Sequence, residues 1–190
     1  MNKKLFLLTS MTIVLTACAS TQKDWQGSGH LRIHQNGEAA TNPRNFVDVN
    51  WQDFSDKILT DNHKRLGIEA SHVHDGSLRI VLPSRLIQKN HSISNKATPL
   101  LKTIAEKMTA NLALRAKIVG HMTNHKQDTL NQTDSLHFAY HTAERLIKQG
   151  VFSSRIEVEG RGSIDPLVSL ESPRSKDINR RVEIYLYQLR

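Results

Sequence analysis

The stretch Asn179-Arg180-Arg181-Val182-Glu183-Ile184, close to the C-terminus, decides the fold of this chain. From Val182 onward, apolar residues occupy every second position, at Ile184 and Leu186. A period of two is typical of a strand that has one face on a core. The sequence therefore predicts a final strand over residues 182–186.

Three further strands and two helices precede this strand. The expected strands cover residues 78–82, 116–122 and 155–160, and the expected helices begin at Thr98-Pro99 and at Ser135. Both helix starts carry a residue that commonly caps a helix, and apolar residues then repeat at helical spacing. Strands joined by a whole helix are parallel neighbours or members of one sheet. The predicted fold is an α/β (α+β) sandwich of order β-α-β-α-β-β, with two helices on one face of a mixed four-stranded sheet.

Short motifs along this region resemble those of the OmpA-like (OmpA/MotB) periplasmic domain. Gly120-His121 matches the end of a family strand, and residues 179–184 match its N-R-R-V-E-I segment. The other matching positions are Asn131, Ser135, Ala139, Leu146, Gly150-Val151, Gly160-Arg161-Gly162 and Pro166. The resemblance covers roughly residues 77–188 and needs no gap between positions 120 and 151. It implies an OmpA-like fold for a domain at residues 67–190.

The resemblance also implies a ligand, because the family binds the diaminopimelate residue of the peptidoglycan stem peptide. One aspartate and one arginine of the family hold the two charges of that zwitterionic end. In this sequence the two positions hold Thr123 and Phe138. Asn131, Arg180 and Arg181 match the family and remain for contacts with an anionic ligand. The five residues therefore form a degenerate peptidoglycan pocket in which binding is weakened.

Other residues near these positions bear on the pocket. Asp128 lies in the loop after the second strand, and Arg145 lies seven residues after Phe138, about 10 Å along the same helix face. Both are possible replacements for the missing charges. The family leucine is replaced by Asp134. Because Met122 and Phe138 bring apolar bulk to charged positions, we expect them to line the former pocket.

The N-terminal segment carries an export signal. Lys3-Lys4 precedes an apolar run over residues 5–15, which is too short to span a bilayer comfortably. The run leads to Leu15-Thr16-Ala17-Cys18, which resembles a bacterial lipoprotein signal and implies that acyl chains such as palmitate attach to Cys18. Ala19 stands where aspartate signals inner-membrane retention. We expect residues 1–17 to be the signal peptide of an outer-membrane lipoprotein that faces the periplasm.

Residues 18–66 are predicted to be a lipidated tether with one amphipathic segment. The first part is rich in polar and turn-forming residues. From Trp51, apolar residues recur at a spacing that fits about two helical turns. Trp51 and Phe54 are either an anchor for a partner protein, since aromatic residues dominate binding hot spots, or part of the domain's own core. We expect them to pack on their own domain.

Composition excludes several classes of protein. The chain has 190 residues, a net charge of +8 and a single cysteine, which excludes a disulfide-rich scaffold. Its one apolar run excludes a polytopic membrane protein. Positive charge alone leaves nucleic acid, anionic lipid and acidic polymers open as partners. Because the basic residues are dispersed, aromatic residues are few and the chain is exported, we expect no nucleic-acid partner.

Histidine pairs raise the possibility of a metal site. His121 and His125 are four residues apart, as are His137 and His141, and zinc sites on helices use that spacing. The sequence indicates no third ligand and contains no H-E-x-x-H or G-x-S-x-G motif. We therefore expect no metal, no cofactor and no catalytic residue.

These observations favour a non-enzymatic structural protein. A lipid anchor with a degenerate OmpA-like domain indicates a structural subunit of an envelope-spanning assembly. Size, lipid attachment and the place of the domain resemble a lipoprotein subunit of a type IV secretion core complex, with other envelope or secretion-complex proteins as partners. The alternative is a peptidoglycan-binding tether between outer membrane and cell wall. A metal-binding or hydrolytic periplasmic protein built on the histidine pairs is a third hypothesis.

Overall fold

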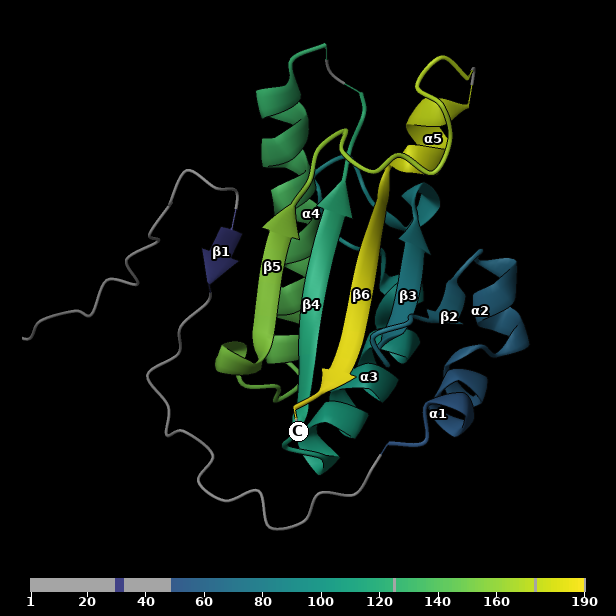
Figure 1. Cartoon of the computed structure of the whole chain (residues 1–190), viewed down its shortest axis with the longest axis vertical. Helices are drawn as coiled ribbons and strands as arrows, with labels where there is room; N and C mark the ends of the chain where they lie inside the picture. Colours follow the sequence, from purple (N-terminus) through teal and green to yellow (C-terminus); the bar gives the residue numbers. More distant parts are fainter. Residues whose placement is uncertain (1–29, 33–48, 125, 173, 190) are drawn as a thin grey trace, which may run out of the picture.

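The computed structural model describes residues 30–32, 49–124, 126–172 and 174–189, which form one mixed sheet with helices packed against it (Figure 1). The strands are β1 (His30–Arg32), β2 (Glu69–His72), β3 (Leu78–Pro83), β4 (Leu114–His121), β5 (Ile156–Gly160) and β6 (Arg181–Gln188). Their order in the sheet is β1-β5-β4-β6-β3-β2. Only β4 and β5 are parallel among these neighbours.

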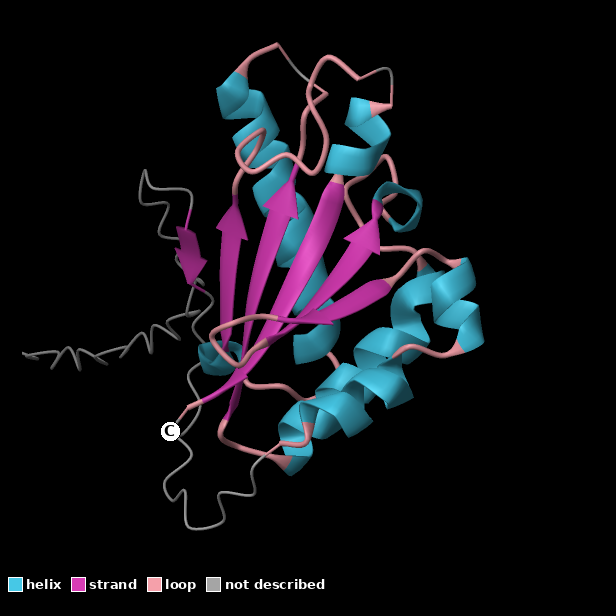
Figure 2. Cartoon of the chain, turned by 45° about the vertical axis from the view of Figure 1, so that its right-hand side comes forward, coloured by secondary structure: helices cyan, strands magenta, loops and turns pink. Residues whose placement is uncertain are grey.

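Two long helices lie on one face of the sheet, and shorter helices lie around its edges (Figure 2). The α-helices are α1 (Trp51–Ile58), α2 (Asp61–Arg65), α3 (Thr98–Ala110), α4 (Asp128–Ile147) and α5 (Ser175–Asn179). Single 3-10 turns are η1 (Ser84–Leu86), η2 (Asn95–Ala97) and η3 (Ser153–Arg155). The predicted fold class and the order of the main elements are confirmed.

Within the described residues the sheet has six strands rather than the four that the sequence predicted. The additional strands β1 and β2 lie at the two edges. Residues 69–72 of β2 are mostly exposed, so they lack the apolar alternation that marks a half-buried strand. β1 has only three residues and pairs with β5. Edge strands that are this short or this exposed show no apolar alternation in the sequence.

The core lies between the sheet and the two long helices. In β4 and β6, inward-facing residues pair across the strands, as in Ala116 with Leu186 and Ile118 with Ile184. On the helix side, Ile104 of α3 and Phe138 of α4 are fully buried in the same cluster. The alternation that predicted the last strand is thus the inner face of a central strand.

Helix α4 approaches the sheet at two glycines. A Cβ on Gly120 at the end of β4 would lie 1.8 Å from the carbonyl oxygen of Ser135, and a Cβ on Gly160 at the end of β5 would lie 2.6 Å from that of Gln132. Such distances exclude any side chain unless the backbone moves. The two glycines therefore allow the first half of α4 to lie directly on the ends of the two parallel strands.

The start of α4 differs from the prediction. The helix begins at Asp128 rather than at Ser135, which lies in its second turn. The first turn is polar and exposes Leu130, so helical periodicity becomes visible only later in the sequence. Ser135 does not cap the helix: its hydroxyl donates to the carbonyl of Gln132 and accepts from the amide of Gly162 at 2.9 Å.

Helix α1 packs on its own domain, as expected for Trp51 and Phe54. Phe54 is 2% exposed within the core cluster, and Trp51 packs partly buried against that cluster. The amine of Lys107 on α3 lies 5.6 Å from the centre of the Phe54 ring. The packed unit therefore includes residues that the sequence assigned to the tether. No helix in the described part of the chain is long and apolar enough to cross a membrane. Cys18 lies outside the described residues.

Candidate functional site: the Phe138 cluster and the Arg181 network

The residues predicted to form the ligand pocket fall into two separate environments. Phe138 and Arg180 lie together, whereas Arg181 lies in a buried polar network at the end of β6. Thr123 follows β4; its hydroxyl is buried and has no hydrogen-bond partner among the described residues. Asn131 lies in the first part of α4 and is 2% exposed.

Two polar side chains lie beside the ring of Phe138, which itself belongs to the buried core cluster. Its ring centre lies 5.3 Å from the guanidinium carbon of Arg180 and 5.3 Å from the ring centre of His91. The Nε2 atom of His91 lies 3.4 Å from Oδ2 of Asp134, which is one helical turn before Phe138. We call His91, Asp134, Phe138 and Arg180 the Phe138 cluster. The cluster brings together a cation and an anion beside a fully buried aromatic ring.

Arg180 is only partly satisfied in this position. Its Nη2 donates to the carbonyl oxygens of Ile87 at 3.0 Å and Gln88 at 3.1 Å. Its Nε is buried and has no acceptor in the part of the chain that the structure describes. Burial lowers the pKa of Arg180, while the carboxylates of Asp177 and Asp134 act in the opposite direction. The guanidinium thus carries hydrogen-bonding capacity that the described residues do not use.

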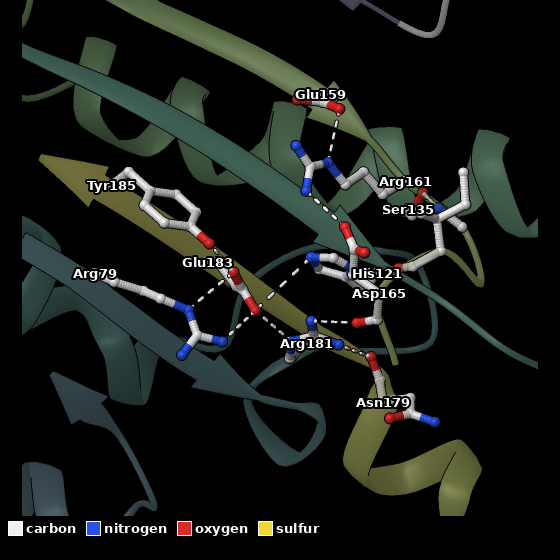
Figure 3. A network of polar contacts seen from close by, with 12 residues as sticks. Arg79, His121, Ser135, Glu159, Arg161, Asp165, Asn179, Arg181, Glu183 and Tyr185 are labelled. Carbon is white, nitrogen blue, oxygen red and sulfur yellow. Dashed lines mark hydrogen bonds and ion pairs between the residues drawn. The ribbon is translucent and has the colours of Figure 1, made fainter. Parts of the chain in front are cut away.

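Arg181 is a structural residue of the sheet. Its guanidinium donates to Oε1 of Glu183 at 2.5 Å and to the carbonyl oxygens of Asn179 and Asp165 (Figure 3). The side chain is 2% exposed. Arg180 is the C-cap residue of α5 with extended backbone, and Arg181 is the first residue of β6. Side chains of successive residues in extended backbone point to opposite sides, so the two arginines lie in different environments although they are adjacent.

Glu183 is the centre of this network. It accepts hydrogen bonds from Arg79, Arg181 and Tyr185 (Figure 3). These donors lower the pKa of Glu183 to about 2, although burial acts against them, and they leave the carboxylate charged. The glutamate of the N-R-R-V-E-I segment therefore holds β3 and β6 together.

His121 is buried next to Glu183 and stays neutral. Its Nδ1 donates to the carbonyl of Ile164 at 3.1 Å, and its Nε2 lies 3.8 Å from Oε1 of Glu183. Burial, followed by the charge of Arg181, lowers the pKa of His121 to about 4. The histidine of the Gly120-His121 pair thus fixes the loop after β5.

Asn179, the first residue of the N-R-R-V-E-I segment, holds a loop in place. Its side-chain amide donates to the carbonyl of Val168 and accepts from the amide of the same residue, at 2.9 Å and 3.0 Å. The pair of hydrogen bonds closes the loop between β5 and α5. The family-like residues at 121, 179, 181 and 183 therefore build the frame of the site.

Asp128 and Arg145, the two possible replacements for the missing charges, have different partners. Asp128 accepts a hydrogen bond from the hydroxyl of Ser163 at 2.9 Å. Arg145 donates to the carbonyl of Ile93 and to the side chain of Asn95. Met122 and Phe138 both belong to the buried core cluster. The charged residues beside Phe138 are Asp134 and Arg180 instead.

Sequence reasoning did not assign His91 or Asp134 to the site. His91 lies in a loop with no periodic pattern. It contacts Asp134, which is 43 residues further along the chain, and Phe138. Asp134 was visible only as a departure from the family leucine. The helical spacing of Asp134 and Phe138, four residues apart, was the one signal that placed an anion next to the substituted position.

The histidine pairs do not assemble a metal site in the described residues, where no group of three histidine, cysteine, aspartate or glutamate side chains could hold an ion. His141 lies 2.9 Å from Glu144 on the same helix. His125, the second member of the other pair, lies outside the described residues.

Comparison with known proteins finds one matching family model, related proteins and similar folds. Residues 88–180 match the model of the OmpA family. The peptidoglycan-binding protein ArfA of Mycobacterium tuberculosis is 33% identical over 85 residues, which are 45% of this chain and 26% of that protein. The corresponding protein of Mycobacterium bovis matches equally. The chain thus spans about a quarter of the length of these relatives.

Solved structures support the fold. The cell wall anchor of the type VI secretion system from Pseudomonas aeruginosa has a TM-score of 0.58 at 22% identity, over 71% of this chain and 97% of that one. A MotB-like protein from Desulfovibrio vulgaris has a TM-score of 0.57 at 18% identity, over 73% and 94% of the two chains. These likenesses establish an OmpA-like fold.

Proposed function

Because residues 88–180 match the model of the OmpA family, we propose that this protein is a non-enzymatic envelope lipoprotein whose domain associates with peptidoglycan. Lipid on Cys18 holds the chain on the periplasmic side of the outer membrane. The protein then connects that membrane to the cell wall. The match to the family supports peptidoglycan association for residues 88–180, and we infer the same role for the whole chain.

One observation carries the proposal. The residues that place α4 on the ends of β4 and β5 are all present and buried, and the matching segment of ArfA belongs to a protein named for binding peptidoglycan. A rigid frame around a site is what precise recognition requires. The frame supports a ligand-binding role for the neighbouring Phe138 cluster.

The substitutions at Thr123 and Phe138 weaken this binding relative to the family. A threonine hydroxyl has no charge for an ammonium group, and a phenylalanine ring has none for a carboxylate. A charge-assisted hydrogen bond is roughly twice as strong as a neutral one, so the loss of two is substantial. We therefore expect association with the wall that is weaker than in family members with both charges.

Co-sedimentation with sacculi tests the proposal. The full chain, purified in detergent micelles, is compared with a Thr123→Asp, Phe138→Arg double variant that introduces both family charges. We expect the natural chain to sediment in part and the variant to sediment more completely. Sedimentation of the variant alone would contradict peptidoglycan association of the natural protein.

The second candidate is a structural subunit of an envelope-spanning assembly, such as a type IV secretion core complex. Four large apolar side chains around the loop between β5 and α5 are at least 40% exposed, and they are Ile164, Leu167, Leu170 and Ile178. Exposed apolar side chains on one loop favour contact with other envelope proteins. Recovery of a large complex with the natural chain, and its loss when these four become serine, supports this role.

A further inference from the structure

The segment 87–93 contacts both charged side chains of the Phe138 cluster. Backbone oxygens of Ile87 and Gln88 accept from Arg180, and the His91 ring lies beside Asp134 and Phe138. One short segment therefore contacts the cation Arg180 and the anion Asp134 at the same time. This arrangement is what a displaceable cover over a charged site requires.

Resting on the proposed association with peptidoglycan, we propose that Arg180 and Asp134 form a relocated site for a zwitterionic amino-acid end, and that residues 88–92 move aside when it binds. Arg180 takes the carboxylate and Asp134 takes the ammonium group. The site uses neither of the two positions at which the family resemblance places these charges, which here are Thr123 and Phe138. The ring of Phe138 forms the floor of the proposed site, between Arg180 and Asp134.

Arg180 has the geometry for a carboxylate. The two backbone oxygens share its Nη2, while the adjacent Nε is buried without an acceptor among the described residues. A carboxylate fits the Nε–Nη2 edge of a guanidinium with two parallel hydrogen bonds. A ligand carboxylate that replaces the two carbonyls would satisfy both nitrogens and add a charge interaction.

Asp134 supplies the matching anion. It lies four residues before Phe138, so both side chains occupy one face of α4. Its carboxylate is partly exposed, at 22%, and its charge acts on Arg180 across the ring. An anion whose charge reaches a guanidinium selects a ligand that carries both charges over one that carries only a carboxylate.

The cover is fixed at its base, whereas its tip forms hydrogen bonds within itself, between Gln88, Asn90 and Ser92. Ile87 and Ile93 form a β-bridge, and Arg145 donates to the carbonyl of Ile93 at 2.8 Å. At the tip, His91 has a φ of 63°, in the left-handed region that residues with a side chain rarely adopt. The backbone therefore favours release of residues 88–92 over movement of the whole segment.

Titration of the full chain in detergent micelles tests the site with three small probes. Meso-diaminopimelate carries both charges, pimelate carries only the carboxylates, and 1,5-diaminopentane carries only the ammonium groups. We expect diaminopimelate to bind at least roughly tenfold more tightly than either. Arg180→Gln removes its preference over diaminopentane, and Asp134→Asn removes its preference over pimelate.

A third variant tests the cover. His91→Asn keeps a residue that tolerates the left-handed backbone and removes the ring that lies over the site. Because a closed cover reduces apparent affinity, we expect this variant to bind diaminopimelate several-fold more tightly, roughly in proportion to the gain in open state. Unchanged or weaker binding would contradict displacement of residues 88–92.

Matched controls separate the site from general charge effects. Asp128→Asn removes a carboxylate from the same helix, and Arg174→Gln removes an exposed arginine near α5; both should leave binding unchanged. The inference fails, while wall association stands, when the natural chain sediments with sacculi and the Arg180 and Asp134 variants keep its probe preferences. Both proposals fail when the natural chain binds neither sacculi nor diaminopimelate.

Discussion

Gly120 shows how one missing side chain sets the position of a helix. Its Cα faces the backbone of α4 so closely that a Cβ would meet the carbonyl of Ser135 at 1.8 Å. We expect Gly120→Ala to destabilise the fold by more than about 3 kcal/mol, because backbone has to move. Chemical denaturation of the two proteins measures the difference.

Gly76 is the matched control for this variant. It has a φ of +81°, but a Cβ at this position would have nothing within 4 Å, so Gly76→Ala tests backbone conformation without steric contact. That variant should lose only about 1 kcal/mol. Equal losses at the two positions would contradict a steric role for Gly120.

Arg155 is a second residue on which the stability of the fold depends. It is 4% exposed and donates to the carbonyl oxygens of Met108, Asn111 and Leu114, near the end of α3. Burial lowers its pKa to about 10, so these hydrogen bonds offset a desolvation penalty. We expect Arg155→Met to lower the free energy of unfolding by about 2–4 kcal/mol.

Thermal melting of Arg155→Met and Arg155→Lys checks this prediction. Lysine keeps the charge but reaches fewer of the three carbonyls, so it should recover only part of the loss. A methionine variant as stable as the natural protein would show that the carbonyls find other partners.

At the scale of elements, α1 is the segment whose role the sequence left open. Phe54 lies in the core, so Phe54→Ala should cost about 3–5 kcal/mol of stability. Gln52→Ala, on the exposed side of the same helix, should change stability by less than about 0.5 kcal/mol. Urea denaturation that gives equal values for both would indicate that α1 does not belong to the packed domain.

The central elements could be predicted because their residues alternate or repeat regularly. The alternation of Val182, Ile184 and Leu186 predicted β6. Gly120, Gly160 and Ser135, which match the family, lie where α4 contacts the sheet closely. The edge strands could not be predicted, because β2 is mostly exposed and β1 has only three residues, so neither shows an alternating apolar pattern. The polar first turn hid the start of α4 for the same reason.

The site was predictable only in part. Arg180 and Phe138 were recognised from their positions in the family pattern, and the structure places them together. Arg181 was grouped with them, although it is the first residue of β6 and its side chain lies in the network of Glu183. His91 reaches the site from a distant loop, and no local pattern reports contacts of that kind.

At the scale of the whole molecule, acid should weaken the fold in two steps. His121 has a pKa of about 4 in the folded protein and 6.5 unfolded, so the unfolded chain alone takes up this proton as pH falls through that interval. Glu183 acts in the same direction between 4.5 and about 2. Stability is therefore highest above pH 6.5 and falls below it, with a loss from His121 on the order of 3 kcal/mol.

Urea denaturation at pH 7, 5.5 and 4 measures the first step. His121→Gln keeps a donor for the carbonyl of Ile164 and has no proton to take up, so its stability should fall less over this range. Parallel pH profiles for the two proteins would contradict the role assigned to buried His121.

Association of the domain with peptidoglycan is the central claim about this protein. Co-sedimentation of the full chain with purified sacculi, with and without excess meso-diaminopimelate, tests it most directly. We predict that part of the protein sediments and that diaminopimelate releases it. Protein that stays in the supernatant, or that sediments to the same extent with the competitor present, would contradict specific recognition of the cell wall.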